Sequence, residues 1–502
     1  MTGPTLQSAP LRTRYEIEQP PPPALTVRRI APLWPLALIL VATCAAYAGS
    51  LRSPLYADDY IYLVAARDWS FGEYARVAFT PWGDEPTFTF TRNYWRPLAF
   101  IWFEIAEPVF GGEPLPYHVV NLGIHIASTV LVWLLASRLD ARPAVRAVAT
   151  AAFALYPGSF EAVTWISSVN SAGLTFALTA WLMFLRATKG EQFRWSPAVA
   201  SACLLAAGLM FRETATALLP AMGLWYVTVQ RRERLRDWRT YLPFVPFVAV
   251  GAVYALIRTR LLTEPLANPE IYRFDSETPD RWWFYVKHAL LPFRDGADGW
   301  RETAQAVAGV LLLATPVVAL LGRRWSILAL SSGLLLSIVP QGATVLGVGL
   351  RYFYFSTPVL GLLLGVAAAD LGALASRSAA SPRARAAAWA GGAALGVLVV
   401  AGALVTKLRI DDWETGGPDQ HQGWVDGLRA EYPELPAAGT LYCANVPIFL
   451  AIFDAVMLEP TVRWYYPEIG DVVHHTQSGP PPLGPGDRFY AAPIPGVTLA
   501  QP

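Results

Sequence analysis

The chain has 502 residues, of which 54% are hydrophobic and only 15% are charged. Ordinary soluble domains carry about 25% charged residues, so this composition excludes a typical soluble protein and indicates a membrane protein. A formal net charge of +1 gives no reason to expect nucleic acid as a partner. The three cysteines form no CxxC pair, so the sequence predicts neither a disulfide framework nor a cysteine-based metal site.

The N-terminal segment divides into a polar tail and an apolar run. Residues 1–29 are polar, contain the proline run 20–23 and end in Arg28 and Arg29, which predicts a disordered cytoplasmic tail. The apolar run 30–49 is long enough to cross a hydrocarbon core about 30 Å thick. No A-x-A-like cleavage site follows it, so we expect a retained first transmembrane helix rather than a signal peptide.

The rest of the chain alternates between apolar spans and polar connections. Together with the first run, these spans predict an all-α polytopic membrane protein of about eleven transmembrane helices. An odd number of spans with the N-terminus inside the cell places the C-terminal segment outside. The further spans are expected near 117–137, 143–157, 169–186, 196–211, 214–230, 241–259, 304–321, 325–341, 353–374 and 386–405.

Basic residues favour the same orientation. They concentrate in the connections that this topology places in the cytoplasm, whereas the short outer loops hold almost no Lys or Arg. Such a bias is typical of a multi-pass inner (cell) membrane protein whose N-terminus is cytoplasmic. The residues that carry the bias are Arg28, Arg29, Arg138, Arg142, Arg146, Arg186, Lys189, Arg194, Arg231, Arg232, Arg234, Arg236, Arg239, Arg323, Arg324, Arg377, Arg383 and Arg385.

Three predicted outer segments are long, namely 50–116, 260–303 and the tail from residue 406. A first loop of this length is more than a connector between helices. The tail shows a helical stretch near 420–431 and candidate strands at 439–444 and 488–492, which predict a small α/β appendage. We therefore expect a tail at 1–29, a transmembrane module at 30–405 and a small extracytoplasmic C-terminal domain at 406–502.

Asp58 and Asp59 follow the first span directly. Two adjacent carboxylates at a membrane interface are costly to desolvate unless they have a partner. One could act as a general base on an acceptor hydroxyl while the other orients an arginine or binds a divalent cation. The alternative is the first turn of a helix, where acidic residues are favoured by the helix dipole.

Two further groups of polar residues lie near the start of the second span. Arg96 could pair with Asp58 or Asp59, could hold a phosphate, or could be a structural arginine in the turn before Pro97. His118, Asn121 and His125 recur on one helical face, which should point into protein rather than lipid. That face could bind a metal or form hydrogen bonds between helices.

Charged residues also stand at the outer ends of later helices. Glu161 lies in an outer turn, Arg212-Glu213 separates the fifth and sixth spans, and Arg351 begins the tenth. The positive-inside bias disfavours Arg212 and Arg351 at these places, so each should have a specific anionic partner. That partner could be a nearby acid, such as Glu213 for Arg212, or a lipid phosphate or pyrophosphate at the outer leaflet.

The order and spacing of these elements resemble the C-type (GT-C) membrane glycosyltransferases. Within that group, the chain is most similar to the protein O-mannosyltransferase-like and TPR-containing transmembrane mannosyltransferase-like branch, over roughly residues 30–375. The elements that carry the resemblance are Asp58-Asp59, 94–98, 117–121 with His125, 161–167, 212–215 and 351–354.

The resemblance implies a transferase that moves a sugar from a polyprenyl-phosphate carrier to an extracytoplasmic acceptor hydroxyl on a glycan, lipid or protein. It implies that Asp58 and Asp59 supply the catalytic base or a metal site, and that Arg351 grips the carrier phosphate. A divalent cation such as Mg or Mn at the two acids is left open, because the sequence supplies no closed ligand set. The other residues expected to bind substrate are Arg96, His118, Glu161, Arg212, Glu213 and Tyr352.

The chain departs from the family pattern at three places. Phe211-Arg212-Glu213 stands where the family often has Ser-Lys-Glu, and 167–170 replaces the usual Ser-Gly-Arg. No TPR repeats follow the last predicted span, so the acceptor contacts of that branch do not carry over.

Two other functions remain as alternatives. A transporter or flippase for a lipid-linked or small polar substrate would need charges near helix midpoints and two matched halves, and the sequence shows neither. A glycan polymerase or ligase would place its key residues in a late loop. His474 and His475 lie in the tail, where histidine pairs are more often solvated and inert.

Overall fold

The computed structural model describes residues 33–73, 76, 95–190, 192–261, 273–292, 299–343, 349–377, 382–437, 439–447, 450, 457–476 and 480–492. Residues from Trp34 onward form one compact unit. The predicted tail at 1–29 lies outside the described residues, as do Asn93 and Tyr94.

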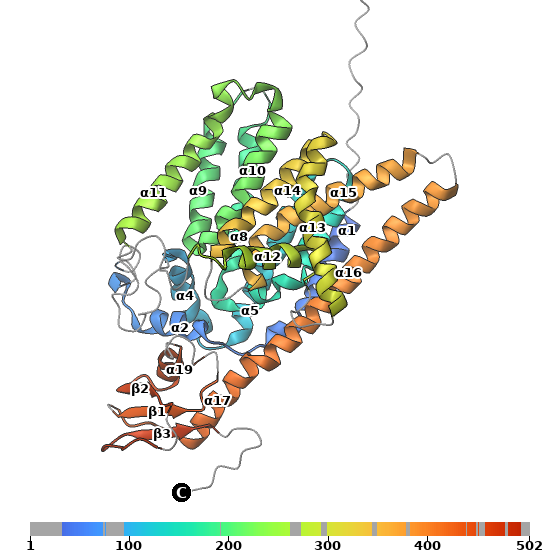
Figure 1. Ribbon diagram of the computed structural model, residues 1–502. Coiled ribbons are helices and arrows are strands. Elements are labelled where there is room, and N and C mark those ends of the chain that lie inside the picture. Colours follow the sequence, from blue (N-terminus) through green and yellow to red (C-terminus); the bar gives the residue numbers. More distant parts are fainter. Residues whose placement is uncertain are drawn as a thin grey trace, which may run out of the picture. The chain divides into compact units, whose positions relative to one another are not determined.

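A helix lies in each apolar span that the sequence predicts (Figure 1). The predicted span at 214–230 consists of three successive helical segments of different type. They are a 3-10 helix at Glu213–Leu218, the α-helix α10 at Leu219–Trp225 and a π-helix at Tyr226–Gln230. The helices are α1 Trp34–Tyr47, α5 Pro114–Leu139, α6 Pro143–Ala154, α8 Asn170–Ala187, α9 Trp195–Phe211, α10 Leu219–Trp225, α11 Val245–Leu261, α13 Gly299–Leu321, α14 Trp325–Ile338, α15 Thr357–Arg377 and α16 Pro382–Gly416.

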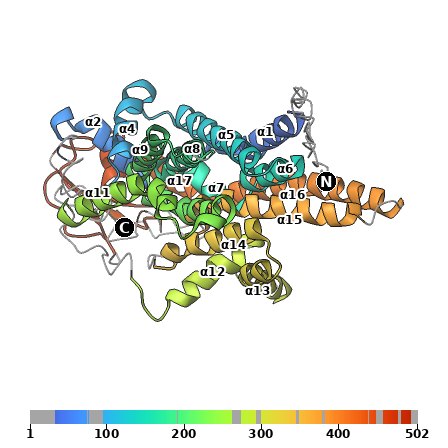
Figure 2. The same ribbon diagram turned by 90° about the horizontal axis from the view of Figure 1, so that it is seen from above.

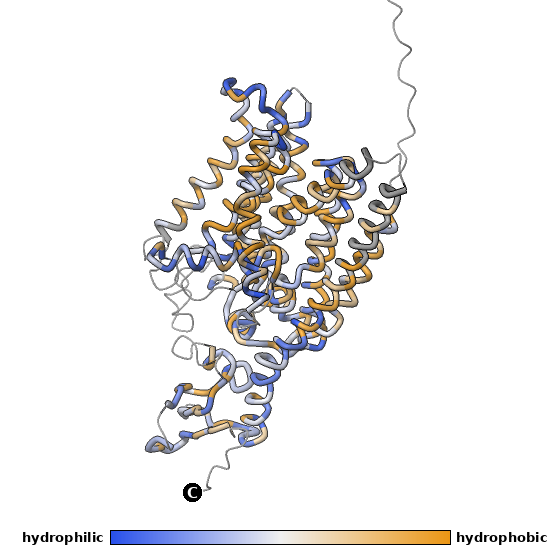
Figure 3. The backbone as a smooth tube through the Cα atoms, turned by 45° about the vertical axis from the view of Figure 1, so that its right-hand side comes forward, coloured by the Kyte–Doolittle hydropathy of each residue, from blue (hydrophilic) through white to orange (hydrophobic). Residues whose placement is uncertain are grey.

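Length and apolar composition establish a multi-pass membrane protein. Among the described residues, 6 helical stretches are long and apolar enough to cross a membrane, and α1, α6 and α9 are shorter apolar helices. Hydrophobic residues dominate the bundle, while hydrophilic ones gather in connections at the helix ends (Figure 3). The total of about eleven spans remains a prediction. The spanning stretches are Pro114–Leu139, Ile166–Ala187, Trp238–Ile257, Gly299–Leu321, Trp325–Ala343 and Leu350–Ala373.

Close helix contacts hold the bundle together. Helix α8 packs against α5 and α9, and α15 packs against α6. Helix α12, Thr278–Leu290, lies side by side with α13 and α14 (Figure 2). Small residues permit the α6–α15 contact, because a Cβ added at Gly361 would meet Ala149 O at 2.5 Å and one added at Gly365 would meet Val145 O at 2.6 Å. Such a spacing of small residues is a usual way for membrane helices to approach closely.

The predicted outer loops contain helices of their own. Helices α2 Asp58–Asp68 and α4 Pro97–Phe110 come from the first loop and pack against each other. Helix α12 Thr278–Leu290 comes from the second loop. A short helix, α7 Phe160–Thr164, and a 3-10 turn at Ile166–Ser168 connect α6 to α8. These short elements carry most of the candidate site.

The C-terminal segment forms the predicted α/β appendage. Helix α16 continues past the predicted end at residue 405 to Gly416 and leads into α17 Pro418–Glu431 (Figure 1). A parallel sheet of order β2-β1-β3 follows, with β1 Thr440–Ala444, β2 Asp471–His474, β3 Arg488–Ala491 and the helix α19 Leu458–Tyr465. Strands β1 and β3 confirm the predicted strands, whereas β2 was not predicted.

Candidate active site

Asp59 ties the start of α2 to the turn before α8. Its side chain is 2% exposed, and its two carboxylate oxygens accept hydrogen bonds from the Tyr56 amide at 2.9 Å and the Ser167 amide at 2.8 Å. Burial raises the pKa of Asp59 to about 7, although the bonds from Ser167 and Tyr56 partly oppose that rise. Because both of its oxygens accept hydrogen bonds from backbone amides, Asp59 fixes the start of α2 relative to the turn before α8.

Asp58 has a different environment although it is the next residue. It is partly exposed, and within the described part of the chain its carboxylate has neither a hydrogen bond from another residue nor an ion pair within 4.0 Å. Burial raises its pKa, while the positive charges of Arg351, Arg212 and Arg96 act in the opposite direction. Asp58 is therefore within electrostatic reach of all three arginines, and the residue is only partly buried.

The turn that presents these acids has an unusual backbone. Ala57 precedes α2 with φ 48° and ψ −113°, a positive φ that residues with a Cβ rarely adopt. Its amide donates to Nδ1 of His421 in α17 at 3.3 Å. Tyr56 packs against His421, Trp165 and Trp413, with ring centroids 5.6 to 5.8 Å apart. Contacts from the appendage thus hold the turn in its conformation.

Arg96 forms a bidentate pair with Glu213 rather than with either aspartate. Its Nε and Nη2 atoms donate to the two carboxylate oxygens of Glu213 at 3.0 and 2.7 Å. The Arg96 side chain is nearly buried, and that of Glu213 is 18% exposed. The hypothesis that Arg96 pairs with Asp58 or Asp59 is therefore wrong. The pair joins the start of α4 to the start of the sixth predicted span.

Arg212 lacks the partner suggested for it, since Glu213 faces Arg96. The backbone at Arg212 is extended, with φ −156° and ψ 127°, so adjacent side chains point in opposite directions. Its Nη1 atom donates to the Ser168 carbonyl at 3.1 Å, and its guanidinium lies 6.0 Å from the Tyr352 ring centroid. In the described residues no carboxylate lies within 4.0 Å of this nearly buried cation.

Arg351 pairs with Glu161, the acid of the outer turn. Its Nη1 atom donates to Glu161 Oε1, and its Nη2 atom donates to the Tyr352 hydroxyl at 3.3 Å. The guanidinium also lies 5.0 Å from the ring centroids of both Trp165 and Tyr352. The anionic partner of Arg351 is thus an acid of the chain itself, Glu161. The two rings fix the plane of the guanidinium.

The polar face of α5 forms hydrogen bonds to other elements. His118 Nε2 lies 2.9 Å from the Ser53 carbonyl, and Asn121 Nδ2 donates to the Val163 carbonyl. His125 lies deeper, with Nδ1 at 2.9 Å from the Tyr354 hydroxyl and Nε2 at 3.2 Å from the Ala154 carbonyl. All three side chains are buried. The structure thus favours bonding between elements over a metal site on this face.

The described residues do not fit a bound divalent cation. They contain no group of three or more His, Cys, Asp or Glu side chains placed to hold a metal ion. Both oxygens of Asp59 already accept backbone hydrogen bonds, and Asp58 faces arginines, which would repel a cation.

Several residues of this region were not among the predicted ones. His421, Tyr56 and Trp413 surround the strained turn, yet no motif or spacing connects 421 or 413 to residue 57. Ser167 takes part through its backbone amide, which every residue except proline possesses. Tyr62 contacts Arg96, which lowers the pKa of the tyrosine against the larger effect of burial.

Comparison with known sequences gives a consistent result. Residues 96–257 match the family model for dolichyl-phosphate-mannose-protein mannosyltransferases. The chain is 27% identical over 262 residues to protein O-mannosyl-transferase Tmtc2 of Drosophila melanogaster, covering 49% of this chain and 27% of that protein. It is 32% identical over 145 residues to protein O-mannosyl-transferase Tmtc1 of the same species, covering 28% of this chain and 16% of that protein. The similarity therefore spans well under two thirds of either relative.

The fold is similar to that of ArnT from Cupriavidus metallidurans. The apo structure of that protein aligns with a TM-score of 0.51 and 16% identity, covering 88% of this chain and 86% of ArnT. Its structure bound to undecaprenyl phosphate aligns with a TM-score of 0.50 and 15% identity, covering 87% of this chain and 89% of ArnT. At this level of identity the likeness concerns the fold.

The helical bundle, with its layer of short helices and charged side chains, defines a multi-pass membrane protein whose fold is similar to that of ArnT. Residues 96–257 are similar to the dolichyl-phosphate-mannose-protein mannosyltransferase family, in line with the resemblance that the order of the motifs predicts.

Proposed function

We propose that this protein transfers a sugar from a polyprenyl-phosphate carrier to an acceptor hydroxyl on the extracytoplasmic side of the inner membrane. The family match and the GT-C fold support a glycosyltransferase, and the names of the Tmtc relatives support transfer to a protein hydroxyl. The observation that carries the proposal is Asp58, a partly buried acid whose pKa is influenced by the charges of three arginines.

Asp58 has the properties of a general base. In this mechanism its carboxylate takes the proton from the acceptor hydroxyl as the hydroxyl oxygen attacks the anomeric carbon of the sugar. The bond from that carbon to the carrier phosphate breaks, and polyprenyl phosphate leaves with the electron pair. Burial raises the pKa of Asp58 above its ordinary value, which makes it a better proton acceptor than an ordinary aspartate.

Arg212 and Arg351 have the properties needed to stabilise the leaving phosphate. Arg212 is nearly buried, and one of its N–H groups is engaged by a carbonyl, which leaves others for a phosphate oxygen. Arg351 is oriented by Glu161 and two aromatic rings. Charge that develops on the leaving oxygen is stabilised best by donors that are already in position.

Asp59 is a positioning residue in this mechanism, since its oxygens are occupied by backbone amides. Arg96 and Glu213 support the site as a closed ion pair. These assignments divide the predicted carboxylate pair into one reacting group and one structural group.

The test uses purified full-length protein with a panel of radiolabelled polyprenyl-phosphate sugars, with and without a chelator, followed by identification of the labelled product. We expect Asp58→Asn to lower transfer by about 10²–10⁴-fold, the usual contribution of a general base, without changing thermal stability. Asp68→Asn at the far end of α2 is the matched control, because Asp68 is exposed and pairs with Arg67. Wild-type transfer by Asp58→Asn would refute the proposed base.

A further inference from the structure

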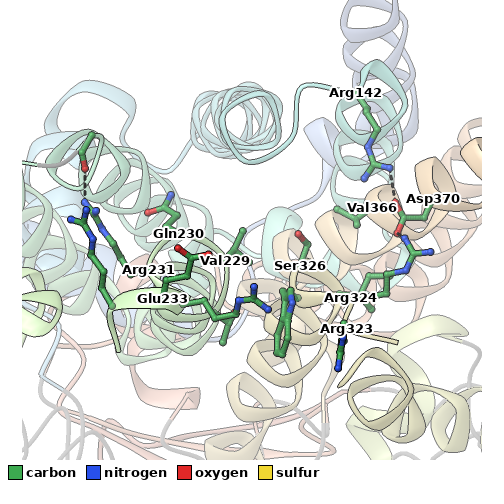
Figure 4. Close-up of a pocket in the computed structure, with 16 residues that line it drawn as sticks. Arg142, Val229, Gln230, Arg231, Glu233, Arg323, Arg324, Ser326, Val366 and Asp370 are labelled. Atoms are coloured by element: carbon green, nitrogen blue, oxygen red, sulfur yellow. Dashed lines mark hydrogen bonds and ion pairs between the residues drawn. The ribbon is translucent and has the colours of Figure 1, made fainter. Parts of the chain in front are cut away.

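A charged cavity lies apart from the Asp58 site. It has a volume of about 760 Å³ and shares no lining residue with that site. Its walls come from the π-helix at Tyr226–Gln230 and the turn after it, the connection between α13 and α14, and the facing side of α15 (Figure 4). By the predicted topology these connections are cytoplasmic.

Arginine dominates the lining of this cavity, which holds six arginines, two acidic side chains and no lysine. Two of the arginines are neutralised within the chain. Arg142 pairs with Asp140 at 2.7 Å and with Asp370 at 2.5 Å, and Arg324 lies 3.3 Å from Asp370 (Figure 4). Asp370 is therefore shared between two cations and leaves the cavity positively charged.

Three other arginines are not neutralised by a carboxylate of the described residues, and contacts orient two of them. Arg231 donates to the carbonyl oxygens of Thr188 and Gly190, and the guanidinium of Arg232 lies 4.6 Å from the Trp325 ring centroid. Neither residue, nor Arg323, has a carboxylate within 4.0 Å among the described residues. Contacts with carbonyls and rings fix the orientation of a guanidinium but leave its charge available to an anion.

Arg323 occupies a backbone position that usually requires glycine. The Arg324 amide donates to the Ala319 carbonyl at 2.7 Å and the Arg323 amide to the Leu320 carbonyl at 3.1 Å, the pattern of a Schellman motif at the end of α13. The φ of Arg323 is 53°, a left-handed conformation that is strained for a residue with a Cβ. An arginine at this position is unfavourable for the turn and places a guanidinium at the cavity.

The positive-inside rule explains arginines on this side of the membrane but not their convergence on one cavity. The cavity has the size of an ordinary ligand site. Arginine forks match the oxygens of a phosphate, and basic pockets between transmembrane helices on the cytoplasmic side bind anionic head groups. We propose that this cavity binds a phosphate group, carried either by an anionic lipid head group or by a soluble phosphate.

The test measures binding to the full-length protein in neutral detergent by thermal shift. Short-chain phosphatidylglycerol, short-chain phosphatidylcholine and inorganic phosphate are titrated separately. The test variant is Arg232→Ala/Arg323→Gly, because glycine suits the left-handed turn and should not destabilise it. The matched control is Arg236→Ala/Arg239→Ala, which removes the same charge from exposed positions that do not line the cavity.

We expect phosphatidylglycerol to raise the melting temperature while phosphatidylcholine does not. The test variant should need at least ten times more phosphatidylglycerol for the same shift, and the control should behave as wild type. Saturation by inorganic phosphate would identify a soluble ligand, whereas a response to phosphatidylglycerol alone would identify a lipid. Equal responses of the test variant and the control would overturn the proposal. So would the absence of a response to both phosphatidylglycerol and inorganic phosphate. The measurement involves no sugar transfer, so its outcome is independent of the role of Asp58.

Discussion

Asp58 and Asp59 show how far adjacent residues can differ in chemistry. On the first turn of a helix, successive side chains point about 100° apart, so Asp59 can be buried while Asp58 stays partly exposed. The sequence predicts both acids as one functional unit. It could not show which is buried, because the partner of Asp59 is the backbone amide of Ser167, 108 positions away.

The buried state of Asp59 leads to a prediction about stability and pH. Because burial raises its pKa to about 7, the folded protein holds a proton that the unfolded chain releases near the ordinary value of 3.8. The contribution of Asp59 to folding stability is therefore full at the acidic end of this range and is lost as the pH rises through about 7. In thermal unfolding in detergent, the melting temperature of Asp59→Asn should fall less than that of wild type between pH 5 and pH 8. Parallel pH profiles for the two proteins would contradict this account.

The charged residues at the helix ends were recognised from sequence, but their pairing was not. The positive-inside rule singles out Arg212 and Arg351, and the positive charges of both oppose the rise that burial causes in the pKa of Asp58. Glu213, however, pairs with Arg96 and not with its neighbour Arg212. The pairing depends on the extended backbone at Arg212 and on the contact between Arg96 and Glu213, which are 117 positions apart. The local spacing of residues in the sequence predicts neither.

At the scale of elements, close packing of α6 and α15 brings two halves of the site together. Helix α6 leads into the turn that carries Glu161, and Arg351 lies in the 3-10 helix Leu350–Ser356 before α15. Gly361 and Gly365 allow these helices to meet almost backbone to backbone. Hydrophobic periodicity predicted both helices, but periodicity contains no information about which helices become neighbours.

The contact between α17 and the turn before α2 predicts a positioning role for His421. Burial lowers its pKa to about 3, so the ring is neutral and Nδ1 can accept the Ala57 amide. In His421→Ala the turn at Ala57 loses this acceptor and its strained conformation should relax. We expect kcat for sugar transfer to fall several-fold, with little change in KM for the carrier or in thermal stability.

Two variants separate positioning from general damage. His421→Asn keeps an acceptor close to the Nδ1 position and should recover most of the activity. Gln422→Ala removes only a hydrogen bond to Asp426 on the same helix and should behave as wild type. If His421→Ala changed KM and kcat equally, or if His421→Asn were as inactive as His421→Ala, the positioning role would be disproved.

At the scale of the whole molecule, composition and patterning predicted the architecture well. Each apolar span contains a helix, and the appendage has the expected helix and two of its strands. The sequence does not predict strand β2, because the strand has only four residues, Asp471–His474. They include two adjacent valines and show no long alternating pattern. The GT-C resemblance rested on motif order, which survives divergence better than overall identity.

The orientation of the molecule in the membrane determines the side on which Asp58 acts. His421 in the appendage contacts the turn beside Asp58, so the appendage and the candidate site share one side. Positive-inside bias predicts that this side is extracytoplasmic and that the connection containing Arg236 is cytoplasmic. Glu434 and Arg236 are both exposed, which makes them suitable positions for a single reactive cysteine.

The prediction is tested by labelling intact cells with a membrane-impermeant maleimide. The background chain carries Cys44→Ala, Cys203→Ala and Cys443→Ala, which remove the free native thiols. We expect Glu434→Cys to be labelled in intact cells, and Arg236→Cys to be labelled only after the membrane is permeabilised. The unsubstituted background serves as the control for residual labelling. The reverse pattern would place Asp58 in the cytoplasm, where the proposed extracytoplasmic transfer could not occur.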